Sequence, residues 1–421
     1  IWRSGGDLTR IRMGPRPLFL VVHPAHVRHV AVTRRQNYDK LQSYDAVREL
    51  MLGNGILTSN GDDWRRQRKL MASFFTPRGV EKFYPVFVSD TQQLIERWRS
   101  HHQGSGRPVE MLDEMMWVTA SVILHSVFST DSDETLLRIK GSVETLLAHL
   151  AGSLTRPVQL PLWLPTPGNL RFRRAKKLVT GYIQELIARR RAIPTEQWPE
   201  DLLTKLMTTR DEETGTLMAE QLLVDNGFTM FAAGHETTAR SLTFMWYALS
   251  QNPEVERRLH AELDSVLGEA PPTINDLKKL PYTLQVVKEV LRLYPAAPMY
   301  ARDAVADDQL DGVHVPAGAR MLVFPYATHR HPDFWDEPER FDPDRWLPER
   351  EAARDPHAYH PFAAGPRICL GNNFSLFETH LITAMLARRF KVRLKPGHQP
   401  RIDMSATLGS RNGVPMLIEA R

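Results

Sequence analysis

The sequence contains very little cysteine, since Cys369 is the only one among 421 residues. A single thiol excludes an intramolecular disulfide and is typical of the reducing cytosol, so we expect a soluble, cytoplasmic protein. Long apolar runs are also missing. The stretch from Leu18 to Val22 is among the longest and is far too short to span a bilayer, and no secretory signal is visible. We therefore expect no membrane span in this chain.

Linkers, repeats and a strong charge are absent as well. No Ser/Gly tract, long charge block or internal repeat marks a domain boundary, so we expect residues 1–421 to form a single domain. The formal net charge is only +5, which is too small a basic excess to indicate binding to nucleic acid.

The stretch around the one cysteine favours the thiolate form of that residue. Residues 362–371 are Phe-Ala-Ala-Gly-Pro-Arg-Ile-Cys-Leu-Gly, and they precede a predicted helix with apolar residues at Phe374, Phe377, Leu381, Met385 and Phe390. A thiol just before a helix meets unpaired N–H groups and the positive end of the helix dipole, which both favour the metal-binding thiolate. A buried structural cysteine is the alternative.

This loop resembles the haem-binding loop of the cytochrome P450 superfamily, Phe-x-x-Gly-x-Arg-x-Cys-x-Gly. Its fixed positions are filled by Phe362, Gly365, Arg367, Cys369 and Gly371. The two glycines lack a Cβ and so let the backbone approach a flat, bulky group. The resemblance implies a haem b cofactor whose axial ligand is the Cys369 thiolate, a ligand that proteins give to haem iron.

A second motif lies in a long predicted helix between Leu217 and Ser250, which contains no proline. Small residues at Ala233 and Gly234 leave room for a flat group, and a glycine inside a helix costs about 1 kcal/mol relative to alanine, so it needs a reason. Thr237 can turn its hydroxyl onto a preceding carbonyl and loosen the helix. A bent core helix is the alternative. The stretch resembles the oxygen-binding helix of the family, which implies that Glu236 and Thr237 deliver protons.

A third motif precedes these two. Asp62 or Asp63 is predicted to cap a helix that begins near Trp64, and Arg68 lies four residues further on the same face. The resemblance implies that Trp64 and Arg68 bind a haem propionate, together with Arg302 and Arg367. For the neighbouring Arg65, Arg66 and Lys69 a solvated basic face is the simpler interpretation.

A fourth motif concerns structure rather than chemistry. Glu289 and Arg292 stand three residues apart on a predicted helix that Pro281 opens, and such residues can pair. The resemblance implies that Glu289, Arg292 and Arg340 form a buried ion network behind the haem. His101-His102 and His329-Arg330-His331 lack a convincing third metal ligand, so we interpret them as surface or loop residues.

Together the motifs predict a mainly helical protein of the cytochrome P450 fold. A large helical lobe would be joined by a small β-rich lobe made of residues about 1–35, 296–325 and 400–421, with the haem between the long central helix and the cysteine loop. We expect the three β segments to share one sheet, with a final hairpin that turns at residues 411–413.

The resemblance implies a monooxygenase that inserts one atom of O2 into an apolar substrate. The alternatives are a peroxide-dependent peroxygenase and a haem-binding sensor. The predicted substrate lining carries no charge and comprises Leu57, Phe228, Phe231, Ala232, Ala233, Pro295, Ala296, Ala297, Met299, Leu408 and Gly409. Such a lining favours terpenoid, steroid or carotenoid molecules over fatty acids, since a polar group without partners would lose free energy there. Arg411 is the one nearby residue that would bind an acid group.

The chain contains no reductase sequence, so the electrons must come from elsewhere. We expect an acidic ferredoxin or flavodoxin-type donor that docks on the face carrying Cys369. The candidate docking residues are Arg65, Arg66 and Lys69, with a second basic cluster from Arg171 to Lys177.

Overall fold

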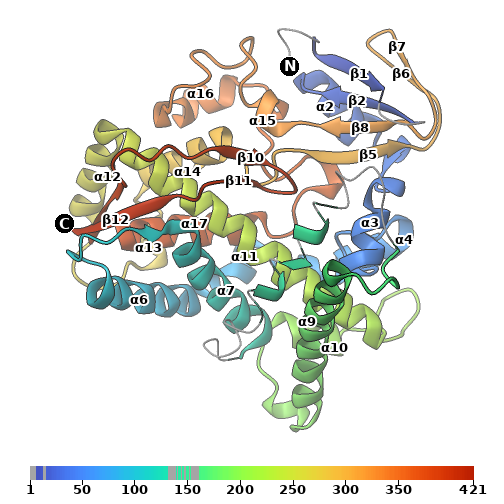
Figure 1. Ribbon diagram of the computed structural model, residues 1–421, viewed down its shortest axis with the longest axis horizontal. Helices are drawn as coiled ribbons and strands as arrows, with labels where there is room; N and C mark the ends of the chain where they lie inside the picture. The colour runs from blue at the N-terminus through green and yellow to red at the C-terminus, as the bar shows by residue number, and fades with distance from the viewer. Residues whose placement is uncertain are drawn as a thin grey trace. The chain divides into compact units, whose positions relative to one another are not determined.

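The computed structural model of the protein describes residues 6–12, 16–130 and 161–421, and also residues 139, 141–143, 145, 146, 148–150 and 152. The chain divides into two compact units. The first comprises Ile1–Ser43, Val80–Met116 and Thr237–Arg421, and the second comprises Tyr44–Gly79 and Trp117–Glu236. Helices predominate, as the sequence predicts (Figure 1).

The main sheet of the first unit has five strands in the order β1-β2-β8-β5-β3. Their bounds are β1 Leu8–Arg12, β2 Pro17–Val21, β3 Tyr38–Asp39, β5 Tyr300–Ala304 and β8 Arg320–Val323. Strands β2 and β8 run parallel, and the other pairs are antiparallel. Phe19 and Met321 are fully buried in the core of this sheet, and helix α2 (Pro24–Arg28) lies beside β2 (Figure 1).

The remaining strands form three smaller sheets, so the prediction of one common sheet is wrong for the C-terminal segment. Their order is β4-β12-β9, β10-β11 and β6-β7, with bounds β4 Val109–Glu110, β6 Asp308–Leu310, β7 Val313–Val315, β9 Phe390–Leu394, β10 Ile402–Met404, β11 Leu408–Ser410 and β12 Pro415–Ala420. Met404 pairs with Leu408, so the hairpin turns at residues 405–407 and not at 411–413. β12 instead pairs with β9 because its buried Met416 and Ile418 complete another core.

The helices of the first unit are α6 Tyr84–His101, α12 Pro253–Val266, α13 Ile274–Leu277, α14 Pro281–Leu293, α15 Pro325–Thr328, α16 Pro348–Ala353 and α17 Asn372–Ala387. α17 packs on α6 through the rings of Phe374 and Phe87, whose centroids are 4.9 Å apart. It ends at Ala387, so Phe390 belongs to β9 and not to this helix. Pro281 opens α14 as predicted.

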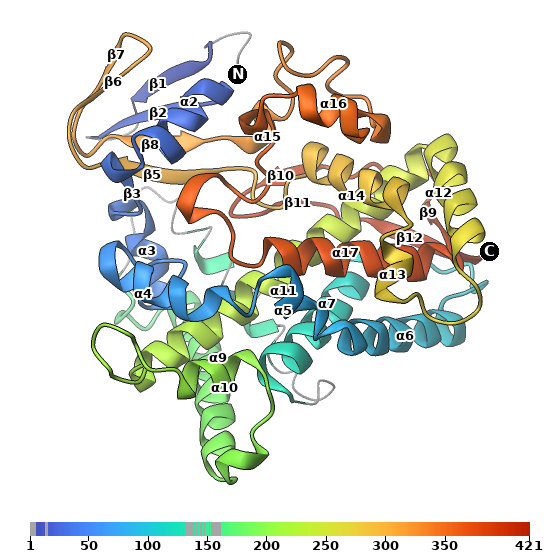
Figure 2. The ribbon, with the colours of Figure 1, turned by 180° about the vertical axis from the view of Figure 1, so that it is seen from behind.

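The second unit contains α3 Asp45–Val47, α4 Gly61–Ala72, α9 Pro167–Arg191 and α10 Leu202–Thr208. α9 and α10 lie side by side (Figure 2), where buried Arg190 pairs with Asp201. Three helices cross the boundary between the units along the chain: α5 Pro77–Glu81, α7 Met111–Phe128 and α11 Glu220–Gln251.

Helix α7 is the one helix in the described part of the chain that is long and apolar enough to cross a membrane. Its mean hydropathy is 1.2, and 78% of this 18-residue segment is buried inside the protein. The core helix of a soluble protein is buried to this extent as well, so the expectation of no membrane span stays a prediction.

Helix α4 begins earlier than predicted. Asn60 stands at its N-cap without a side-chain cap bond, and the helix starts at Gly61. Asp62 and Asp63 lie in the first turn, where they face the positive end of the helix dipole, so neither residue is the cap.

Candidate active site

The cysteine loop of the first unit, residues 362–371, is held by backbone contacts. The Cys369 N–H donates to the Phe362 carbonyl at 2.8 Å. Gly365 has φ +69°, and a Cβ at this position would lie 1.9 Å from the Ala31 carbonyl oxygen, so only glycine fits. Cys369 is exposed and in no disulfide, and Gly371 is the N-cap of α17. The thiol therefore stands at a helix N-terminus, as the sequence predicts.

Three cations, Lys40, Arg302 and Arg367, gather close to this thiol. Burial lowers the pKa of Lys40 well below its usual value, and the charges of Arg302 and Arg367 lower it further. Arg302 is only 3% exposed; it donates to the Ala301 carbonyl and lies over the Tyr300 ring, and no carboxylate among the described residues pairs with it. Arg367 pairs with Asp39 at 2.6 Å.

The buried guanidinium of Arg302, which pairs with no carboxylate among the described residues, calls for an anion. The two carboxylates of a haem would supply one beside the thiol, so these residues fit the group that the cysteine loop implies. Lys40 was missed by the sequence analysis, because no motif or spacing distinguishes it from a surface lysine.

Helix α11 carries the second motif, residues 233–237. The helix belongs to the second unit up to Glu236 and to the first unit from Thr237. Ala233 is exposed, whereas its neighbours Phe231, Ala232 and His235 are buried. A Cβ on Gly234 would lie 2.7 Å from the Ile123 side chain, so this glycine lets α7 pack closely on α11. Close helix packing explains Gly234, and Ala233 is the exposed small residue of the motif.

The predicted proton-delivery pair occupies consecutive positions of α11. Glu236 is 4% exposed, and Thr237 is half-buried. The preceding His235 is fixed by two hydrogen bonds. Its Nδ1 bonds the Phe231 carbonyl, and its backbone carbonyl accepts from the Thr119 hydroxyl. Burial lowers the pKa of His235, which keeps the imidazole neutral.

Helix α4 carries Trp64 and Arg68 in the second unit, and both side chains are half-exposed. The neighbouring basic residues have acidic partners: Arg65 pairs with Asp62, Arg66 with Asp63, and Lys69 with Glu212. The basic face predicted for donor docking is therefore largely neutralised. The propionate role of Trp64 and Arg68 stays a prediction.

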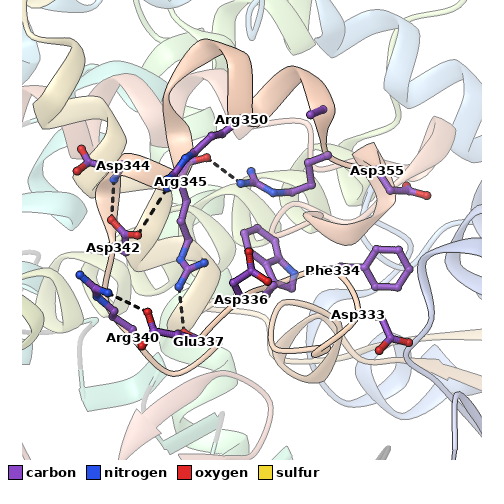
Figure 3. A pocket seen from close by; sticks show the side chains of 13 residues that line it. Asp333, Phe334, Asp336, Glu337, Arg340, Asp342, Asp344, Arg345, Arg350 and Asp355 are labelled. Atoms are coloured by element: carbon purple, nitrogen blue, oxygen red, sulfur yellow. Dashed lines mark hydrogen bonds and ion pairs between the residues drawn. The ribbon is translucent and has the colours of Figure 1, made fainter.

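The buried ion network of the first unit exists, but one of its members was wrongly assigned. The two carboxylate oxygens of Glu289 accept from Arg292 at 2.9 and 2.8 Å, and both residues are fully buried. The Arg340 guanidinium is exposed and pairs with Glu337 (Figure 3); only its carbonyl accepts from Arg292. The second cation near Glu289 is Arg345, at 3.4 Å.

His329 to His331 follow α15 in a turn, so the interpretation as loop residues is correct, but all three are buried and the surface alternative is wrong. His329 is fully buried; its Nδ1 bonds the Arg292 carbonyl and its Nε2 accepts from the His360 N–H at 2.9 Å. His331 is 3% exposed and bonds Asp7. Within the described residues no group of three or more ligating side chains is placed to bind a metal ion.

The predicted substrate lining is divided between the two units. In the second unit Phe228, Phe231 and Ala232 are buried, and Leu57 is half-buried. In the first unit the Leu408 N–H donates to the Ala296 carbonyl at 2.9 Å, which joins the segments 295–299 and 408–409. Ala297 and Met299 of these segments are partly exposed.

The residue that would have bound an acid group is already engaged. Arg411 is largely exposed, and its guanidinium pairs with Asp403 at 3.1 Å. Figure 3 shows a different cavity of about 740 Å³, which lies between charged residues of the segment 333–355. None of the predicted lining residues takes part in that cavity.

Comparisons with known proteins match nearly the whole chain. The family model described as Cytochrome P450 matches residues 3–415. The chain is 36% identical to cyclooctat-9-en-7-ol 5-monooxygenase of Streptomyces melanosporofaciens, over 93% of this chain and 84% of that protein. It is 33% identical to pentalenene oxygenase of Streptomyces avermitilis, over 99% and 91% respectively. The crystal structure of the cytochrome P450DA haem domain superimposes with a TM-score of 0.90 at 24% identity, over 99% of this chain and 90% of that one.

Proposed function

The chain belongs to the cytochrome P450 family and is a haem-thiolate monooxygenase, and we propose that its substrate is a cyclic terpenoid. Two relatives are named for terpenoids, cyclooctat-9-en-7-ol and pentalenene. The observation that carries the proposal for this chain is the uncharged predicted lining, which offers hydrocarbon surface. Two cations lie beside it and both are engaged: Arg411 pairs with Asp403, and Arg240, whose guanidinium lies against Gly409, donates to the Leu408 carbonyl.

We assign the residues of the site as follows. When bound, the haem supplies the activation of O2 and the transfer of one oxygen atom to a C–H bond. Cys369 would hold the iron from the N-terminus of α17, where the helix dipole stabilises the thiolate. Arg302 and Arg367 would hold the propionates through their positive charge, and Lys40 beside them would donate hydrogen bonds. Trp64 and Arg68 from α4 are proposed to add to this binding.

Protons must reach the site while bulk water is excluded. Glu236 is buried and Thr237 half-buried, so we propose that the Thr237 hydroxyl would hold a proton beside the haem and that the Glu236 carboxyl would replace this proton through water. Replacement of Thr237 by alanine is expected to leave haem and substrate binding intact and to divert most electrons to hydrogen peroxide. The ratio of product formed to reductant consumed measures this, and a ratio equal to that of the wild type would refute the role.

The substrate proposal is tested with ligands of matched size. Binding of an apolar molecule beside the haem shifts the spin state of the iron, which absorption spectroscopy follows. We expect cyclic diterpene or sesquiterpene alcohols to shift it at micromolar concentration, and fatty acids of the same carbon number to bind at least tenfold more weakly. Stronger shifts with the fatty acids would overturn the terpenoid assignment while leaving the monooxygenase activity in place.

The electron donor is proposed to be a separate acidic ferredoxin or flavodoxin. The pairing of Arg65, Arg66 and Lys69 with acids reduces the charge that α4 offers to such a donor. Product formation with a ferredoxin and its reductase, compared with peroxide alone, separates the monooxygenase reaction from the peroxygenase alternative. A cytoplasmic location stays a prediction from the single cysteine.

A further inference from the structure

In the second unit, the turn just before helix α9 exposes the side chain of Trp163 to solvent. Trp163 is 74% exposed, which is the largest exposed fraction of any large apolar side chain in the described part of the chain. The turn is fixed to the helix, because the Asn169 amide donates to the carbonyls of Pro161 and Leu164 and the Thr166 side chain caps α9. Trp163 is therefore displayed by an ordered turn.

Helix α9 continues this surface along its outer face. Phe172, Val179 and Ile183 bury the inner face in the core. Leu170, Arg174, Lys177 and Leu178 follow the spacing i, i+4, i+7, i+8 and so share the opposite face, where all four are exposed. Two leucines thus flank two cations on a face that continues from Trp163.

The charge of this face is not neutralised. Residues 161–184 contain five basic side chains and no acidic one. Arg171, Arg173, Arg174 and Lys177 pair with no carboxylate among the described residues. In contrast, Arg65, Arg66 and Lys69 of α4 each pair with one. At the C-terminal end of α9 the cations are paired with acids, since Arg189 pairs with Glu185 and Arg191 with Glu220.

A groove of about 370 Å³ opens on the same face. It is lined by Ile139, Arg174, Lys177, Leu178, Gly181, Tyr182 and Glu185. The Tyr182 hydroxyl is buried and has no hydrogen-bond partner among the described residues. Two cations and an unused hydroxyl beside Leu178 match a phosphate group joined to a hydrocarbon chain.

We propose that the turn at Trp163 and the outer face of α9 dock this protein on an anionic lipid surface, with lipid phosphate between Arg174 and Lys177. An acidic protein would be attracted by the same charges. An exposed indole and leucines placed among the cations favour the bilayer interface, where tryptophan is enriched and where cations bind anionic headgroups. This docking is peripheral and stands apart from the assignment of the substrate.

The test is sedimentation of the haem-loaded protein with vesicles. We expect binding to vesicles of equal phosphatidylglycerol and phosphatidylcholine, which falls as salt rises, and at most weak binding to pure phosphatidylcholine. The double variant Arg174→Gln, Lys177→Gln is expected to bind about thirtyfold more weakly, since each cation near an anionic bilayer contributes about 1 kcal/mol. Trp163→Ala is expected to cost about tenfold, through lost apolar burial.

The double variant Arg189→Gln, Arg191→Gln is the matched control, because it removes the same two charges from the same helix and should bind nearly as the wild type does. Circular dichroism and haem content verify that each variant is folded. The proposal would be overturned if the wild-type protein did not sediment with anionic vesicles, or if both double variants lost the same amount of binding. Capture of an acidic ferredoxin in place of vesicles, through Arg174 and Lys177, would replace the lipid by a protein partner.

Discussion

Two carboxyl groups of the first unit, Glu289 in α14 and Glu378 in α17, are both fully buried, yet their surroundings differ completely. Glu289 accepts from Arg292 twice, from the Asp342 N–H and from the Trp346 indole, and Arg345 adds a second charge. Neither oxygen of Glu378 forms a hydrogen bond of normal geometry with a described residue. The first region stabilises an ionised carboxylate, and the second does not.

The difference shows two ways in which a protein accommodates a buried acid. A buried carboxylate must be compensated by donors and cations, or it keeps its proton. Burial raises the pKa of Glu378 well above its usual value, and the nearby buried Asp90 raises it further, while the Thr238 hydroxyl lowers it slightly. Burial therefore favours the protonated form of Glu378, whereas Glu289 is surrounded by donors and cations.

The largest expected effect comes from removing the charge of Glu289. Glu289→Gln leaves the Arg292 guanidinium buried without its counter-charge, so we expect a loss of about 3–5 kcal/mol in the free energy of unfolding and poorer haem retention. Urea unfolding of the haem-loaded protein measures it. Glu337→Gln, which breaks the exposed pair with Arg340, is the control and should not change the midpoint measurably. A small effect of Glu289→Gln would remove the contrast between the two regions.

The regions around Glu289 and Glu378 also show which contacts could be predicted from the sequence. The pairing of Glu289 with Arg292 was predictable, because an i,i+3 spacing on a helix brings the side chains together whatever the rest of the chain does. Arg340 was wrongly included because its neighbour Glu337 and the direction of the chain after Pro338 decide which arginine turns inward. Those are tertiary facts, and only the structure shows that Arg345 takes this place.

Glu378 was missed, although a signal was present. It lies on α17 one position after Phe377 and three before Leu381, within a helix whose other buried positions are mostly apolar or small. A glutamate in such a stripe indicates a buried acid, but its lack of hydrogen-bond partners depends on α6 and α11, which the sequence does not place. The start of a helix just after Cys369 was, in contrast, predictable from the local pattern, whereas the contact of Gly365 with Ala31 and the end of α17 at Ala387 were not.

An intermediate effect is expected from Glu378→Gln, and its dependence on pH sharpens the comparison. Because the pKa of Glu378 is raised in the folded state, the folded protein holds a proton that the unfolded chain has released above about pH 4.5. The wild type is therefore destabilised as pH rises above that value, and the glutamine variant lacks this penalty.

We expect the variant to lie within about 1 kcal/mol of the wild type at pH 5, since one neutral group replaces another, and to gain stability relative to it towards pH 8. Unfolding curves at three pH values measure the trend. A stability difference between variant and wild type that is independent of pH, or one in which the variant loses stability relative to the wild type as pH rises, would show that Glu378 is ionised in the folded protein.

The smallest expected effect lies in the one hydrogen bond that borders Glu378. The Thr238 hydroxyl bonds the Ser375 hydroxyl at 3.1 Å, and this links α11, one residue after the proposed proton donor Thr237, to α17, one turn before Glu378. Thr238→Val keeps the shape of the side chain and removes this bond, so we expect a loss of about 1 kcal/mol in the free energy of unfolding.

Coupling between the two hydroxyls is the decisive quantity for this bond. The double variant Thr238→Val, Ser375→Ala should lose less than the sum of the single losses, because each change alone already breaks the bond. Thr243→Val provides the comparison, since Thr243 bonds the Ala239 carbonyl of its own helix and its loss should add to that of Ser375→Ala. If Thr238 and Ser375 are also additive, the hydroxyls act separately, and Glu378 borders two independent groups. If they are coupled, the uncompensated acid adjoins a hydrogen bond that holds α11 to α17, and the loss of the Thr238 hydroxyl should also raise the pKa of Glu378.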